Sequence, residues 1–462
     1  MFSTPTHLYY YCYILNMKIL STTTINAPNQ SLGDSTTDRK IHLNPWDLQF
    51  LPFGANQTAG LLYKHPLEKI DTIIHQLKCS LSSTLAFFPL LAGRLEITEH
   101  ENDNTISCYL KCNNAGVLFV HAVEKNVAVA DILRSTCPPQ FIQSLFPLNG
   151  IKNYEGTSQP LLAVQVTELI DGIFLALTIN HVVIDGKPTW NFINSWAEIS
   201  KLNGCLQISK QPKPTLERWF PNAIQLPIRF PFTIEKNHAD NDGKEKLNPP
   251  ERLFHFTKEK IMELKSKANI EAESNNISSL QALLTHIWRS VVLSRGFDPQ
   301  EEVQFMIVID TRSRFFPPLP EDYFGNAIIL SGVSMKVGEL LKEGGLGKGA
   351  QEMNKMIASH TNEKLKNHYE SWLKTPSFIS LGSVANSNSL VVSSSPRFNV
   401  YECDFGWGKP LRVRSGDSNK RNGKISVYPG AEEGSVDIEV CLPYEILEAM
   451  ENDPEFMGVV SN

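Results

Sequence analysis

A histidine and an aspartate four residues apart, His181 and Asp185, are the side chains of this chain best placed to do chemistry. The apolar run 173–179 leads directly into them, and its composition, bounded by Asp171-Gly172, predicts a strand. A titratable imidazole at the end of a buried strand is costly unless it is used. Such an imidazole is largely neutral near pH 7 and can accept a proton, so the placement suggests acid–base chemistry. The alternative is a core histidine with both ring nitrogens satisfied.

The spacing alone is a weak signal, because the chain holds 12 histidines and a second match exists. His238 and Asp242 have the same spacing, but they lie in the polar, charged stretch 236–244. That stretch has no hydrophobic periodicity and is interpreted as a solvated linker. The pair at 181 and 185 is favoured by its context.

A second motif lies more than two hundred residues downstream, in Asp404-Phe405-Gly406-Trp407-Gly408. Two glycines flank a tryptophan, so the backbone can turn sharply or approach a ligand closely. The indole offers an N–H donor beside a large apolar face. The Asp-Phe-Gly triplet does not indicate a kinase, because no His-Arg-Asp catalytic loop or early Gly-rich phosphate loop is present. The alternative is a tight turn capped by an aromatic plug.

With both motifs, the chain resembles the plant BAHD acyltransferase family from about Met17 onward. Further segments that carry the resemblance are Leu43–Leu48, Phe88–Leu95, Asp310–Arg314, Pro317–Pro320 and Tyr323–Ala327. Their order and spacing together make the resemblance specific.

The resemblance implies acyl transfer from a coenzyme A thioester to an alcohol or amine, without a covalent acyl-enzyme. His181 would be the general base, and Trp407 and Ser393 would donate to the oxyanion. Acyl-CoA would be a co-substrate, with Ser278 and Ser394 as candidate contacts, and no metal or prosthetic group is expected. A helix N-terminus at Ser278 can bind an anion, although a simple helix cap is an equally good interpretation.

The resemblance gives the acidic residues structural roles. Asp185 would pair with Arg312 and fix the loop that presents the imidazole, because a buried carboxylate needs such a partner. Asp404 would hold its turn together with Gly406 and Gly408.

One departure from the family pattern affects the expected pocket wall. The family usually has a tryptophan just ahead of Arg397, and Ser395 stands in its place here. A lyase or other non-transfer enzyme that reuses the channel is therefore the alternative function. A non-catalytic binding protein is a third possibility, although binding alone needs no base at position 181. The acyl donor, the acceptor, and the choice between O- and N-acylation cannot be read from the sequence.

The elements that would position these residues read as α/β. Runs 161–167 and 173–179 predict an antiparallel hairpin, and 189–202 predicts an amphipathic helix. A strong helix is expected over 280–293, with Ser278 as its N-cap. The run 415–424 is predicted to be a solvated hairpin tip, although its cations could meet nucleotide phosphates.

The resemblance implies two domains of similar size, each a mixed sheet with flanking helices, like chloramphenicol acetyltransferase. The active-site channel would lie between them, with donor and acceptor entering from opposite faces. Residues 17–205 and 251–462 are the expected domains, and 206–250 the crossover linker. Residues 1–16 are expected to be a disordered extension before a functional start at Met17.

Composition fits an ordinary globular enzyme. Of the 462 residues, 42% are hydrophobic and 20% charged, and the net charge of −6 gives no reason to bind nucleic acid. The eight cysteines form no metal-ligand pattern and favour free thiols in a reducing compartment over disulfides. No run of about 20 apolar residues predicts a membrane span. We expect a cytoplasmic monomer.

Overall fold

The computed structural model describes residues 17–28, 39–54, 57–133, 136–137, 139–202, 213–220, 224–232, 249–379, 388–416 and 420–461. The proposed extension over 1–16 and the second His-Asp match at 238 and 242 lie outside these ranges.

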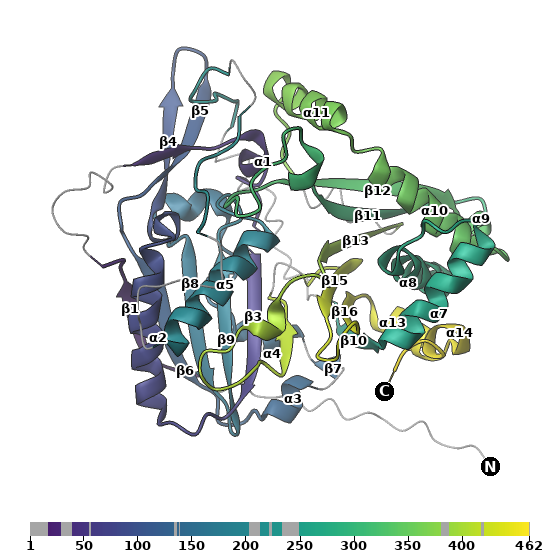
Figure 1. Ribbon diagram of the computed structural model, residues 1–462, viewed down its shortest axis with the longest axis horizontal. Helices are drawn as coiled ribbons and strands as arrows, with labels where there is room; N and C mark the ends of the chain where they lie inside the picture. Colours follow the sequence, from purple (N-terminus) through teal and green to yellow (C-terminus); the bar gives the residue numbers. More distant parts are fainter. Residues whose placement is uncertain are drawn as a thin grey trace.

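The N-terminal half is built on a six-stranded sheet in the order β1-β6-β8-β9-β3-β14. Its strands are β1 (Lys18–Ile25), β6 (Val117–Val123), β8 (Leu162–Glu168), β9 (Gly172–Ile179), β3 (Gln57–Lys64) and β14 (Arg412–Arg414). Helices α2 (Ile70–Leu85) and α5 (Gly186–Lys201) contact each other and lie together in front of this sheet (Figure 1). β9 is buried along its whole length, as expected for a strand with both faces covered.

A smaller three-stranded sheet in the order β2-β5-β4 completes this half. It consists of β2 (Lys40–His42), β5 (Thr105–Lys111) and β4 (Arg94–His100). The short elements α1 (Pro45–Leu48), η2 (Pro89–Ala92), α3 (Val129–Leu133), α4 (Pro139–Ser144) and η3 (Asn153–Thr157) connect the strands.

The C-terminal half is built on a seven-stranded sheet in the order β12-β11-β13-β15-β16-β10-β7. Its strands are β12 (Ile328–Lys336), β11 (Glu302–Asp310), β13 (Ser389–Ser394), β15 (Lys424–Pro429), β16 (Val436–Cys441), β10 (Glu251–Phe256) and β7 (Thr136–Cys137). The helices of this half are α7 (Lys258–Glu271), α8 (Ser279–Arg295), α9 (Val337–Leu341), α10 (Gly345–Ala358), α11 (Asn362–Lys374), α13 (Tyr444–Glu451) and α14 (Pro454–Met457). The 3₁₀ turns η4 (Arg312–Arg314) and η5 (Val400–Glu402) complete it. Figure 1 shows this sheet and its helices beside the N-terminal half.

The predicted fold class is confirmed. Both large sheets mix parallel and antiparallel pairs, such as parallel β6–β8 beside antiparallel β8–β9. Separate apolar cores lie in the two halves, one around β9 and α5 and one around α8 and β11.

Each half contributes one strand to the large sheet of the other half. β14 comes from the C-terminal half and pairs with β3 of the N-terminal sheet. β7 comes from the N-terminal half and pairs with β10 of the C-terminal sheet. Segments beyond residue 250 thus complete the first sheet, which a division of the chain into consecutive domains cannot represent.

The described parts of the expected linker are packed. Phe230 is fully buried and bridges to Ile106, and Arg218 is buried against Asp47. These segments are therefore part of the N-terminal core, because an apolar ring and a paired charge both gain from burial.

Local predictions around the site are largely confirmed. β8 and β9 form the expected antiparallel hairpin, and α5 covers the predicted helix but begins at Gly186. α8 starts after Ser278, which forms a reciprocal capping box with Gln281.

The run 415–424 contradicts its prediction. β14 and β15, on either side of it, belong to different sheets, and Lys420 is fully buried. The Lys420 ammonium group pairs with Glu251 and Glu439, and Arg414 pairs with the same two carboxylates. A buried charge cluster therefore joins the halves where a solvated turn was expected, because two carboxylates from the C-terminal sheet neutralise the cations.

Candidate active site

The backbone of His181 is fixed on both sides by asparagine side chains. Its N–H donates to Oδ1 of Asn153 over 2.8 Å, and its carbonyl accepts from Nδ2 of Asn326 over 2.8 Å. Asn180, the residue before it, donates to the carbonyl of Asn153 over 2.7 Å. The strand end is therefore a rigid support for the imidazole, since its polar backbone groups are satisfied in the core.

The imidazole itself is held between an aromatic ring and an amide. It stacks on Phe50 with a centroid distance of 3.7 Å and is 7% exposed. The side-chain nitrogen of Gln57 lies 2.6 Å from Nε2. With the amide nitrogen as donor, Nε2 is the acceptor in this contact and the ring proton lies on Nδ1. Nε2 is thus the nitrogen with a lone pair for an incoming proton.

Burial lowers the pKa of His181 from 6.5 to about 4, and the nearby charge of Lys424 acts in the same direction. The ring is therefore neutral at pH 7, as a general base must be.

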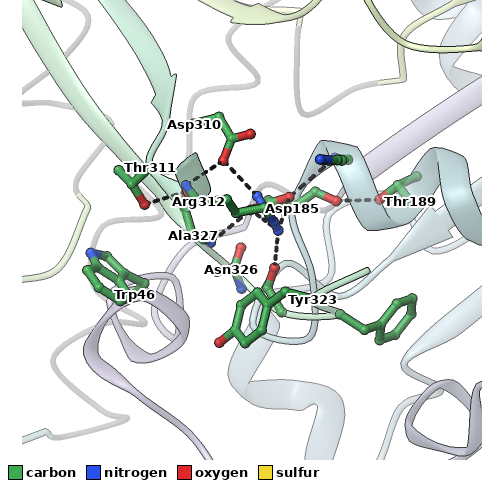
Figure 2. Close-up of polar contacts among 12 residues, drawn as sticks. Trp46, Asp185, Thr189, Asp310, Thr311, Arg312, Tyr323, Asn326 and Ala327 are labelled. Atoms are coloured by element: carbon green, nitrogen blue, oxygen red, sulfur yellow. Dashed lines mark hydrogen bonds and ion pairs between the residues drawn. The ribbon is translucent and has the colours of Figure 1, made fainter. Parts of the chain in front are cut away.

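Asp185 and Arg312 form the predicted ion pair (Figure 2). Nη2 of Arg312 lies 3.0 Å from Oδ2 of Asp185, and both side chains are almost fully buried. The carboxylate also accepts from the amides of Ala327 over 2.8 Å and Lys187 over 3.2 Å, the latter as the N-cap of α5. None of these contacts involves His181, so the geometry does not form a His–Asp dyad.

Arg312 is held as a cation by two carboxylates. Burial acts to lower its pKa, but the charges of Asp185 and Asp310 outweigh this effect and raise it. Its guanidinium group also donates to the carbonyl of Gly325 over 2.7 Å. The pair therefore ties the loop after His181 to the C-terminal half.

A second buried network was missed by the sequence reasoning. Asp47 accepts from both the backbone and the side chain of Asn326 and pairs with Arg218 over 2.8 Å. Arg218 in turn donates to the carbonyl of Val183 over 2.7 Å. The network thus supports the carbonyls of His181 and Val183 from behind. Asp47 and Asn326 lie in segments that carry the family resemblance, but no local pattern assigns them this contact.

His181 lines a cavity of about 680 Å³ between the two halves. Its walls are largely aromatic and aliphatic, from Phe50, Phe53, Trp190, Ile379 and Phe398. Such a wall with a few polar groups is typical of small-molecule sites. Trp190, which also packs in the N-terminal core, and Gln57, for which the sequence gave no signal, both belong to it.

Ser393, Ser394 and Ser395 form one polar edge of this cavity. Leu390 and Val392 of β13 pack into the C-terminal core, so alternation turns Ser393 toward the opposite face of the sheet. Ser394 has a φ of +69°, an unusual backbone conformation for a residue with a side chain, and it marks the end of the strand. The structure thus brings Ser393 and Ser394 into the His181 cavity.

A larger groove of about 2040 Å³ adjoins the cavity. Leu280, Ile307, Ser395, Arg397 and Phe398 are among the residues that line both. Ser278 lies in the groove at the start of α8, where its hydroxyl accepts from the amide of Gln281. Cavity and groove therefore form one path that ends at the imidazole.

Trp407 lines neither the cavity nor the groove, so the structure does not bring it beside His181 as the donor that the resemblance implied. Its ring packs on Tyr63 at 5.2 Å, and Tyr63 pairs with Ile173 at the other end of β3 from Gln57. Six residues along a strand span roughly 20 Å. Two motifs that are both prominent in the sequence are thus separated by the length of the sheet.

The turn around Trp407 has the structural geometry expected of Asp404. Oδ1 of Asp404 accepts from the amides of Gly406 and Gly408, each over 2.9 Å, and its other oxygen pairs with Lys201. The two glycines have φ of +109° and +99°, which a residue with a Cβ adopts only under strain. The turn requires this spacing of aspartate and glycines.

Within the described ranges, no three His, Cys, Asp or Glu side chains gather as a metal site would require. Among the helices described, none combines the length and apolar character needed to cross a bilayer.

Comparison with known proteins places these features in a family. A model described as the Transferase family matches residues 17–457. An uncharacterized acetyltransferase of Arabidopsis thaliana is 40% identical over 425 residues, covering 90% of this chain and 94% of the relative. BAHD acyltransferase DCR of the same plant is 35% identical over 466 residues, covering 96% and 93%.

Solved structures share the fold. Vinorine synthase superposes with a TM-score of 0.71 at 20% identity, covering 96% of this chain and 98% of that one. TRI101 of F. graminearum, in complex with coenzyme A and deoxynivalenol, gives a TM-score of 0.72 at 16% identity, covering 92% and 99%.

Proposed function

This chain belongs to the BAHD acyltransferase family, and from that premise we propose that it moves an acyl group from an acyl-CoA thioester to a hydroxyl or amine. The acceptor would be a small plant metabolite. The observation that carries the proposal is a buried, neutral imidazole on the wall of a largely apolar cavity that opens into a larger groove.

His181 is the proposed general base. A hydroxyl or amine in the cavity would replace the amide of Gln57 at Nε2 and lose its proton there as its heteroatom attacks the thioester carbonyl. Collapse of the tetrahedral intermediate would expel the coenzyme A thiolate, to which the imidazolium can return the proton. Holding both reactants at one ring removes much of the entropic cost of their encounter.

Ser393 is the proposed donor to the oxyanion of that intermediate. It lines the cavity on the channel-facing side of β13, and its hydroxyl forms no hydrogen bond with another described residue. A free hydroxyl at this position can turn toward a developing charge, and loss of one such donor typically costs about 2.7–4 kcal/mol. Ser394 lies beside it and is a candidate contact for the acyl thioester.

The groove is the proposed site of coenzyme A. Lys258, Lys265, Arg314 and Lys409 line it as possible phosphate partners, interleaved with carboxylates. Ser278 lies on its wall at the start of α8, where helix amides favour anions. The donor would thus approach through the groove and the acceptor through the cavity.

The proposal is tested by release of free thiol from acyl-CoA in the presence of candidate alcohols and amines. Acceptor-dependent release is expected, and His181→Ala should lower kcat by about 10²–10⁴-fold with little loss of stability. Ser278→Ala should raise the KM for acyl-CoA if the residue contacts the donor. Turnover of a conjugate without thiol release would instead favour a lyase, and an unchanged rate in His181→Ala would refute the assigned base.

A further inference from the structure

Lys424 is a cation in the His181 cavity that the proposed mechanism does not use. It opens β15, opposite Val391 of β13 and Cys441 of β16. Ile425 and Val427 of the same strand pack into the C-terminal core. Alternation along the strand therefore turns Lys424 toward the N-terminal half, where it lines the cavity.

The ammonium group of Lys424 is unpaired. In the described part of the chain it forms no hydrogen bond or ion pair, whereas Lys420, four residues earlier, pairs with Glu251 and Glu439. Burial lowers the pKa of Lys424 to about 8, and the charge of Arg421 adds to this effect. The side chain is still mostly protonated at pH 7, so a partly buried charge faces the cavity without a counterion among the described residues.

Lys424 and His181 lie within the reach of one small molecule. Both residues line the same cavity of about 680 Å³, a volume typical of a small-molecule site. The charge of Lys424 also lowers the pKa of His181, as expected for near neighbours.

Lys424 belongs to the acceptor side of the path. It lines the cavity but not the groove. Two carboxylates that line the cavity, Asp185 and Asp310, are engaged by Arg312. Among the residues that the structure describes, the other charged side chains on the cavity wall are Lys187, Glu321, Arg397 and Arg421. Cations are in excess, so an anionic group on the occupant would be favoured.

We propose that Lys424 binds a carboxylate of the acyl acceptor, so that the preferred acceptors are hydroxy or amino compounds with an apolar ring and a carboxylate within about 10 Å of the nucleophile. This inference rests on the proposed acyl transfer. The aromatic walls would hold the ring, and Lys424 and His181 would hold its two polar ends. A bound carboxylate would also screen the imidazole from the Lys424 charge, which makes Nε2 a stronger base when the acceptor is present.

The test uses matched acids and methyl esters. The probes are hydroxybenzoates, aminobenzoates, hydroxycinnamates and cyclohexane hydroxy acids, each paired with its ester. Binding of each probe alone is measured by calorimetry, and kcat/KM by thiol release from acetyl-CoA and benzoyl-CoA. The wild-type chain should prefer at least one acid over its ester by about 10- to 150-fold, the range of a hydrogen bond to a charged group.

Three variants test whether Lys424 is the cation that binds the carboxylate. Lys424→Met should abolish the preference, because it weakens binding of the acid and leaves binding of the ester unchanged. Lys424→Arg should retain most of it, which also shows that the site tolerates substitution. Lys336→Met, at an exposed lysine of the same sheet outside both cavities, makes the same change in net charge and should have no effect.

Two results would overturn the inference. One is equal binding of acids and esters by the wild-type chain, and the other is a preference that survives in Lys424→Met. If esters and acids are acylated alike, acyl transfer stands and the carboxylate site fails. If acids bind through Lys424 but no thiol is released, the carboxylate site stands and acyl transfer fails.

A further comparison tests whether Lys424 binds a carboxylate on the acceptor or one on the acyl group of the donor. Malonyl-CoA and succinyl-CoA are compared with acetyl-CoA and butyryl-CoA. If Lys424→Met lowers kcat/KM only for the dicarboxylic donors, the lysine binds the acyl group, and its assignment to the acceptor is wrong.

Discussion

Burial of a neutral imidazole makes a quantitative prediction about acid stability. The pKa of His181 is lowered from 6.5 to about 4, so between these values the unfolded chain binds a proton that the folded chain does not. Stability must therefore fall as the pH falls through this window. The full effect corresponds to about 3 kcal/mol, of which about 2 kcal/mol is already lost between pH 7 and pH 5.

The perturbation that isolates this effect is His181→Gln, which keeps a polar side chain but cannot titrate. We expect the free energy of unfolding of the variant to fall less with acid than that of the wild-type chain, by about 2 kcal/mol between pH 7 and pH 5. Urea unfolding followed by tryptophan fluorescence measures this difference. Other buried histidines contribute equally to both chains and cancel. His75→Gln, at an exposed position, controls for the loss of an imidazole.

The lowered pKa of His181 also predicts where activity falls on the acid side of the pH–rate profile. Because kcat/KM reports the free enzyme, its acid limb should lie near pH 4 and not near 6.5. A limb at 6.5, together with parallel pH dependences of stability in the wild-type and His181→Gln chains, would refute the reasoning. The ring would then be solvated, and its stacking on Phe50 would not describe the free enzyme.

Three further predictions concern the surroundings of the base. Asp185→Ala should destabilise the fold by about 3–5 kcal/mol and lower activity, because it leaves the Arg312 charge buried without its main partner; an unchanged urea midpoint would contradict this. Gln57→Glu places a carboxylate at Nε2 and should raise the pKa of His181 by about 1–3 units. The acid limb of the kcat/KM profile should then move to higher pH by the same amount, whereas Gln57→Asn should leave the limb where it is. Ser395→Trp should narrow the cavity where it meets the groove and lower kcat/KM for bulky acceptors by about tenfold. Competition between bulky and small acceptors measures this effect, and Ser395→Ala should not change the ratio of their kcat/KM values.

Features encoded by neighbouring residues were predictable from the sequence. The β8–β9 hairpin follows from two apolar runs around Asp171-Gly172, and the start of α8 follows from Ser278 and Gln281. The Asp185–Arg312 pair is 127 residues apart in sequence and came only through the family resemblance. Local propensity acts over a few residues, so it cannot find such a partner.

Features that depend on how distant segments meet were not predictable. The family resemblance implied a catalytic role for Trp407, but its place is set by packing on Tyr63. Lys420 looked solvated because its neighbours are polar, although Glu251 and Glu439 neutralise it in the interior. In both cases the environment comes from strands that the local sequence does not contain.

Gln57 illustrates a further limit. It begins β3 and lies beside the imidazole only because β3 pairs with β9 in the register that sets Gln57 opposite Ile179. A shift of one residue would turn its side chain to the other face of the sheet. The tautomer of the base therefore depends on strand register, which no short motif records.

β7 of the N-terminal half pairs in the C-terminal sheet, and β14 of the C-terminal half pairs in the N-terminal sheet. Neither half should therefore fold correctly when it is expressed as a truncated fragment. A fragment that stops before residue 412 would leave β3 as an open edge, ready to pair with another chain and aggregate. It would also leave Glu251 without its guanidinium partner. During synthesis, therefore, the six-stranded sheet of the N-terminal half can be completed only after residues 412–414 have been made.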